Sequence, residues 1–306
     1  MHQIFAQGRQ GSGDGVVMRY SGLEAFLRRD RGRLGGGPVA LIFCEDQAEI
    51  DTTLRHHLQL GFRPVLAFMA PHLALAPDLT AQVLRIDWDP AADRAVPHAV
   101  DRLSEAAPGL WMFYCYNAEF LFYPFSETRS VPEMLAFHTE ERRAAMLTYV
   151  VDLYAGDLDR WPDAVSLDDA WMDRTGYYAL ARPDPARHNH PKERQLDFFG
   201  GLRWRYEEHV PPERRKIDRI ALFRAARGLR LRSDHTFSDE EYNTYACPWH
   251  HNLTAALMSF RTAKALKRNP GSSESIRSFR WHGSVRFDRQ SRQLLDLGLI
   301  EPGQWF

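Results

Sequence analysis

Short apolar runs that alternate with amphipathic stretches constrain the fold of the first 120 residues. Residues 50–60 and 96–103 carry apolar side chains at helical spacing. Around them lie four runs that are typical of strands, the most apolar of which suit burial on both faces of a parallel sheet: residues 39–44, 63–68, 82–86 and 110–115. Strands that alternate with helices predict an α/β fold with a doubly wound, mostly parallel sheet flanked by helices.

The rest of the chain gives weaker signals. We expect a helix over 131–150 and a long polar connection over 157–200, which would be an acceptor-site lid or a mobile loop. Basic residues become frequent from residue 200 onward. The predicted organisation is an N-terminal segment (1–37), one α/β domain (38–265) and a C-terminal basic, helical extension (266–306).

Charge and cysteine content limit the partners and the compartment. The chain has 39 basic and 40 acidic residues among 306, and its net charge of -1 gives no general attraction to nucleic acid. Three widely spaced cysteines indicate a reducing compartment. No run approaches the roughly 20 apolar residues of a membrane span. We therefore expect a cytoplasmic protein without an integral membrane segment.

Polar residues follow the expected strands at their carboxyl ends. Glu45 and Asp46 follow the first strand, and Tyr116-Asn117-Ala118-Glu119 follows the fourth. Because open α/β sheets bind ligands beyond the carboxyl ends of their strands, these side chains are candidates for a binding site.

Several sequence blocks occur in a fixed order between residues 39 and 265. The acidic pair Glu45-Asp46 precedes a Leu-Gly-Phe step at 60–62, and the segment 111–124 runs from a Trp to a Tyr-Pro pair. Later blocks lie at 200–205, 219–223, 233–235 and 257–261.

In order and spacing these blocks resemble bacterial family-2-like glycosyltransferases with the GT-A fold, in the subgroup whose metal motif reads Asp-Ala-Asp-Glu-Phe. Here Tyr116 and Ala118 stand where the two Asp residues belong, and Ser259 stands where the family has a His. The resemblance implies a nucleotide-sugar donor and a glycan or lipid-linked acceptor. It places the donor at Glu45, Asn117, Arg203, Arg205, Arg219, His235 and Arg261.

The changed motif raises the question of what neutralises the diphosphate leaving group. A divalent cation, arginines or backbone donors can do so. Glu119 is the one good anionic ligand left for Mn²⁺ or Mg²⁺, and Asn117 and Ser259 add only weak oxygen ligands. Arginine binds phosphate through two hydrogen bonds, so we expect arginines to substitute for the metal.

Transfer with inversion also needs a carboxylate base near the acceptor. Asp152 or the pair Asp168-Asp169 can serve, and the spacing does not choose between them. Glu119 is a second candidate catalytic residue.

Three other segments invite functional interpretations that we disfavour. The glycine-rich run 8–15 lacks the Lys-Ser/Thr of a phosphate loop. His188-Asn189-His190 and the segment 247–251 lack a second partner at structural-zinc spacing.

The leading hypothesis is a glycosyltransferase-like protein that transfers a sugar from a nucleoside-diphosphate sugar to a glycan or polysaccharide precursor, either without metal or with Mn²⁺ or Mg²⁺ at Glu119. The alternative is a non-catalytic descendant that binds a glycan, a nucleotide or a protein. The basic segment 261–292 suggests a further expectation, peripheral contact with the inner membrane face.

Overall fold

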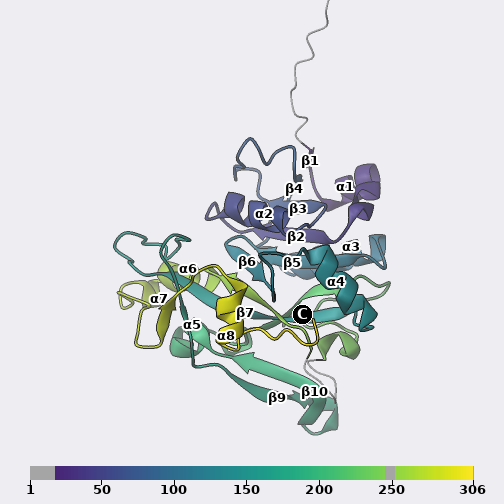
Figure 1. Cartoon of the computed structure of the whole chain (residues 1–306). Coiled ribbons are helices and arrows are strands. Elements are labelled where there is room, and N and C mark those ends of the chain that lie inside the picture. The colour runs from purple at the N-terminus through teal and green to yellow at the C-terminus, as the bar shows by residue number, and fades with distance from the viewer. Residues whose placement is uncertain (1–17, 245–251, 306) are drawn as a thin grey trace, which may run out of the picture.

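The computed structural model describes residues 18–244 and 252–305 (Figure 1). The glycine-rich run 8–15 and the segment 247–251 lie outside the described residues. Within them, no helix is both long and apolar enough to span a bilayer.

The first half of the chain forms the parallel part of a large sheet. Its strands lie in the order β1-β4-β3-β2-β5, and each is parallel to its neighbour. Burial explains their composition, since every residue of β2 and β3 is buried. The strands are β1 (Arg19–Tyr20), β2 (Val39–Cys44), β3 (Val65–Met69), β4 (Leu84–Asp87) and β5 (Trp111–Tyr116).

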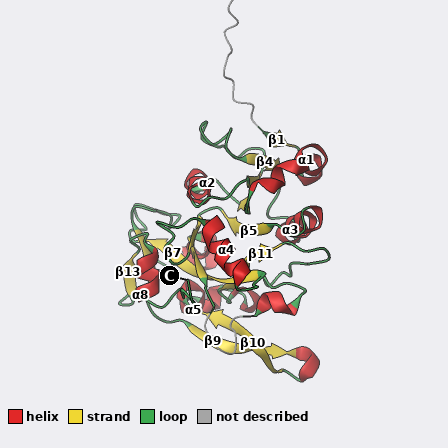
Figure 2. Cartoon of the chain, turned by 45° about the vertical axis from the view of Figure 1, so that its right-hand side comes forward, coloured by secondary structure: helices red, strands yellow, loops and turns green. Residues whose placement is uncertain are grey.

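Helices cover both faces of these strands. In Figure 2, α2 (Ile50–Gln59) lies on one side of the strands, and α1 (Leu23–Asp30) and α3 (Ala95–Ala106) lie on the other. The strands and helices expected at the start of the chain are therefore present, within a few residues of their predicted bounds.

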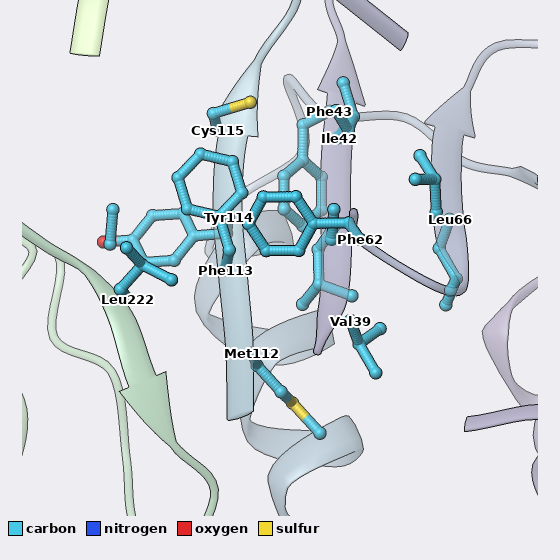
Figure 3. Packing of buried hydrophobic residues seen from close by; sticks show 14 of the residues in the cluster. Val39, Ile42, Phe43, Phe62, Leu66, Met112, Phe113, Tyr114, Cys115 and Leu222 are labelled. Carbon is cyan, nitrogen blue, oxygen red and sulfur yellow. The ribbon is translucent and has the colours of Figure 1, made fainter. Parts of the chain in front are cut away.

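Aromatic side chains fill the space between β2, β5 and α2. Phe62 stacks on Phe113, with ring centroids 5.1 Å apart, and the His57 ring stacks on Phe113 at 5.0 Å. Figure 3 shows Phe62 and Phe113 together with Phe43 and Leu66 of the same core. Burial of His57 lowers its pKa to about 3, so this ring is a neutral member of the core.

The second half of the chain makes the sheet mixed rather than mostly parallel. β11 (Asp218–Arg224) is antiparallel to both β5 and β7 (Ala145–Ala155). β12 (Ala255–Ser259) runs parallel to β7, and β6 (Glu119–Phe122) is antiparallel to β12. Pairing alone therefore brings β5, β6, β7, β11 and β12 to one region of the sheet.

The helix expected over 131–150 is half wrong. α4 (Val131–Glu140) starts at a capping box between Ser130 and Glu133, but the chain then turns at Arg142, whose φ is 55°. β7 follows, because its β-branched and aromatic residues suit a buried strand.

The connection expected over 157–200 is also wrong in part. It contains β8 (Ala170–Asp173), which pairs with β7, and the antiparallel hairpin of β9 (Tyr178–Asp184) and β10 (His190–Phe199). The hairpin lies at the lower edge of Figure 1, and His188-Asn189-His190 lies at its exposed tip.

The segment expected as a helical extension contains a strand as well. β13 (Ser284–Arg286) pairs with β8, and Phe287, Leu294 and Ile300 pack in one cluster with residues of β6 and β12. The helices of the last third are short: α5 (Gly201–Arg205), α6 (Arg261–Arg268), α7 (Pro270–Ser273) and α8 (Ser291–Asp296).

Candidate functional site

The two-residue turn between β5 and β6 organises the loop that follows β2. Asn117, fully buried, accepts a hydrogen bond from the Glu45 N–H (2.8 Å) and donates to the side chain of Asp46 (2.8 Å) and the carbonyl of Ala48 (2.8 Å). Both loops lie beyond the carboxyl ends of parallel strands. Asn117 therefore acts as a scaffold residue for Glu45 and Asp46, and its amide is already used.

Glu119 forms a buried ion pair with Arg219. The guanidinium approaches the two carboxylate oxygens at 2.6 and 3.2 Å, with the side chains 0% and 2% exposed. Ser259 Oγ and the Tyr116 N–H also donate to this carboxylate. Burial alone would raise the pKa of Glu119, but the charge of Arg219 outweighs it and holds that pKa below its ordinary value.

Aromatic rings and a second arginine surround this pair. The Arg261 guanidinium carbon lies 3.8 Å from the centre of the Tyr116 ring, and that of Arg219 lies 5.3 Å from it. Tyr114 Oη and His235 Nδ1 share a hydrogen bond of 3.0 Å. Burial, and then the positive charges of the nearby arginines, depress the pKa of His235 well below its ordinary value, so its imidazole is neutral.

Helix α6 provides cations to both acids of the β2 loop. Arg261 makes two bonds of 2.7 Å to the Glu45 carboxylate, and Lys264 and Arg268 pair with Asp46 at 3.0 and 2.6 Å. The side chain of Arg261 is 33% exposed, so this pair can be reached from solvent.

Asp152 and Arg203 form the third part of the site. Asp152 is 1% exposed, and its Oδ2 accepts the Leu202 N–H at 2.9 Å. Its Oδ1 lies 3.8 Å from Arg203 Nε and is a buried atom without a hydrogen-bond partner within the described residues. Burial raises the pKa of Asp152. Arg203 itself donates to Thr262 Oγ1 and to the Lys216 carbonyl.

We call Arg203, Arg219 and Arg261 the arginine cluster. All three lower the pKa of His235, and the charges of Arg219 and Arg261 add to the burial that lowers the pKa of Arg203. The fold therefore brings most of the expected site residues together: Glu45, Asn117, Glu119, Asp152, Arg203, Arg219, His235 and Arg261.

Arg205 lies in a different environment. It pairs with Asp173 at 3.0 and 3.1 Å and donates to the Phe279 carbonyl. Tyr154 and Trp281 donate to the same carboxylate. These contacts account for Arg205 as a residue that stabilises the fold away from the arginine cluster.

The alternative candidate for the catalytic base, the pair Asp168-Asp169, also lies away from the arginine cluster. The Asp169 carboxylate accepts from the Trp171 indole and the Asp157 N–H, and Asp168 lines a separate cleft on α2 and β6.

Sequence reasoning missed Lys216 and Tyr114, and it named Tyr116 as a candidate without giving its ring a role. Lys216 ranks with the arginines among the charges that lower the pKa of His235, and Tyr116 provides the ring beneath Arg261. The sequence did hold a signal for Tyr116, because a Tyr stands there in place of the first Asp of the motif. Lys216 follows two arginines, and nothing in the pattern distinguishes it from them.

The residues at Glu119 do not fit a divalent metal. Its carboxylate already receives the Arg219 guanidinium and two neutral donors, and a metal there would face that positive charge directly. Within 18–244 and 252–305, no group of three His, Cys, Asp or Glu side chains forms a candidate metal site.

Comparisons of the chain with protein-family models, with curated proteins and with solved structures give no significant match.

Proposed function

We propose that this chain is a glycosyltransferase-like protein that binds the diphosphate of a nucleotide sugar through arginines in place of a metal ion. The observation that carries the proposal is the Arg219–Glu119 pair, because a protein guanidinium contacts the one acidic residue left in the segment that resembles the metal motif. The GT-A-like fold is part of this proposal. The α/β sheet and the place of the β5–β6 turn are compatible with it.

The charges of the site suit an anion. Three arginines face Glu119, Glu45 and Asp152, and the raised pKa of Asp152 weakens its contribution as an anion. Lys216 lies near His235 as well, and its charge already pairs with Asp197 and Asp234. A diphosphate would supply the missing negative charge, and guanidinium groups suit its oxygens through paired hydrogen bonds.

Arg261 is the group that a ligand can reach. Its pair with Glu45 is partly exposed, so a phosphate oxygen can reach the guanidinium and compete with the Glu45 carboxylate for it. The Tyr116 ring stacks on the Arg261 guanidinium, and this contact does not depend on whether Glu45 or a phosphate is its partner.

The alternative, a non-catalytic binding protein, is favoured by one observation. Both candidate catalytic carboxylates, Glu119 and Asp152, are almost fully buried and already accept hydrogen bonds. In this structure Asp152 positions Arg203 and the start of α5, rather than presenting a free base to an acceptor hydroxyl.

The first experiment is thermal shift with UDP-, GDP-, dTDP- and ADP-sugars, each with manganese and with a chelator. Binding to the folded state raises the melting temperature, so we expect one nucleotide class to stabilise the protein in chelator. Arg261→Gln should abolish the shift. Arg268→Gln is the matched control, because Arg268 lies on the same helix and also pairs with an acid.

Two outcomes contradict the proposal. Stabilisation that needs manganese would show that a metal site exists after all. No stabilisation by any donor would remove the nucleotide site altogether. If a donor binds, release of nucleoside diphosphate from it separates a transferase from the non-catalytic alternative.

A further inference from the structure

A cleft lies on the face of β6 opposite to Glu119 and the arginine cluster. Side chains alternate along a strand, so Phe120 and Phe122 face away from Glu119. They line a cleft of about 390 Å³ together with residues of α2, of the segment 161–168, and of the segment after β13. This volume is typical of small-molecule sites.

Aromatic rings underlie the cleft, and only a small part of each is exposed: 4% of Phe120 and 7% of Phe122. The His56 ring contacts Phe120 and Phe122 at centroid distances of 5.5 and 5.3 Å, and Phe122 contacts Phe287 at 5.3 Å. Burial lowers the pKa of His56 to about 4, so the ring is neutral. Its Nε2–H donates to the Leu121 carbonyl at 2.8 Å, so Nδ1 is the acceptor nitrogen, and it has no hydrogen bond within the described part of the chain.

The rim of the cleft carries charged groups that a ligand can reach. Within the described residues, the exposed side chains of Asp168 and Arg289 line the cleft and make no hydrogen bond or ion pair with the protein. The indole Nε1–H of Trp161 is buried without a partner there, which is costly for a donor. Glu49 adds a second carboxylate, which also accepts a hydrogen bond from Thr52.

These features select a class of ligand. The rim has two acids, Glu49 and Asp168, and two arginines, Arg55 and Arg289, of which Arg55 already pairs with Asp78. The balance of charge does not favour a phosphate or another strong anion. An aromatic floor beneath mixed donors and acceptors suits a neutral ring with one apolar face and several hydroxyl groups.

We propose that this cleft binds a neutral saccharide unit, with the sugar ring over the Phe120–His56–Phe122 floor and its hydroxyls at Asp168 and Arg289. This site shares no residue with the arginine cluster. It therefore stands whether or not the chain binds a nucleotide sugar.

The test is saturation-transfer NMR of the full chain with a panel of glucose, galactose, mannose, N-acetylglucosamine, maltose, cellobiose and lactose. We expect transfer to at least one sugar, and at least about tenfold weaker binding in Asp168→Ala and Arg289→Gln, since each removes a charged hydrogen-bond partner. Asp159→Ala and Arg227→Gln are matched controls, because both residues are exposed and lie outside the cleft. They should bind as the wild type does.

Three results would overturn the inference. One is no transfer to any sugar of the panel. Another is binding that both cleft variants leave unchanged. The third is binding that Arg261→Gln abolishes while Asp168→Ala does not, because that would place the sugar at the arginine cluster.

Discussion

Removing Arg219 should cost more stability than removing both members of its ion pair. In Arg219→Met, the Glu119 carboxylate stays buried with only the Ser259 hydroxyl and the Tyr116 N–H as donors. Breaking a fully buried pair in this way typically costs about 3–5 kcal/mol. In Glu119→Gln/Arg219→Met neither position carries a charge, so part of that loss should be recovered.

The assay is urea unfolding followed by tryptophan fluorescence, for which the chain has eight tryptophans. The expected order of unfolding free energy is wild type, then the double variant, then Arg219→Met. A loss below about 1 kcal/mol in Arg219→Met, or a double variant no more stable than it, would refute the argument that burial makes this pair interdependent.

The pH dependence gives a second check on the same variant. Without Arg219, burial should raise the pKa of Glu119 above its ordinary value of 4.5. A carboxyl whose folded pKa is raised destabilises the protein as the pH rises through that pKa. The deficit of Arg219→Met relative to the double variant should therefore grow from mildly acidic to neutral pH. A constant deficit would contradict this.

Two further predictions concern Asp152 and its neighbours. Burial raises the pKa of Asp152 above 3.8, so the wild type should lose stability relative to Asp152→Asn as the pH rises through that pKa; parallel melting temperatures across pH would contradict it. Gly201→Ala places a Cβ 2.8 Å from Asp152 Oδ2 at a φ of +63°, whereas Gly298→Ala has a φ of +67° and no atom within 4 Å. Both should pay about 1 kcal/mol for the left-handed backbone, and Gly201→Ala should melt lower because Asp152 must also move. Equal melting temperatures of Gly201→Ala and Gly298→Ala would show that the Asp152 side chain can move without loss of stability.

Local pattern predicted the first half of the sheet well. Residues 39–44 form β2 as expected, because a strand buried on both faces needs an unbroken apolar run. The same reasoning failed at 145–150, where the first part of β7 was expected to be the end of a helix. The partners of β7 lie at Asp218–Arg224 and Ala255–Ser259, far along the chain, so local periodicity carries no trace of the pairing.

The candidate site shows the same limit. Sequence blocks proposed Glu119, Arg219 and Arg261 as separate members of a site, and the structure brings them to one place. That Glu119 and Arg219 neutralise each other across 100 positions could not be read from spacing. Arg205 shows the converse, since it sits two residues from Arg203 but pairs with Asp173.

Asn117 has a consequence for how this sequence can change over generations. Its single amide accepts from Glu45 and donates to Asp46 and Ala48, and each of these two acids pairs with a base on α6. Aspartate there would set a carboxylate against a carbonyl and another carboxylate, and glutamine is one methylene too long. We therefore expect a substitution at position 117 to be tolerated only with compensating changes in the β2 loop and on the basic face of α6.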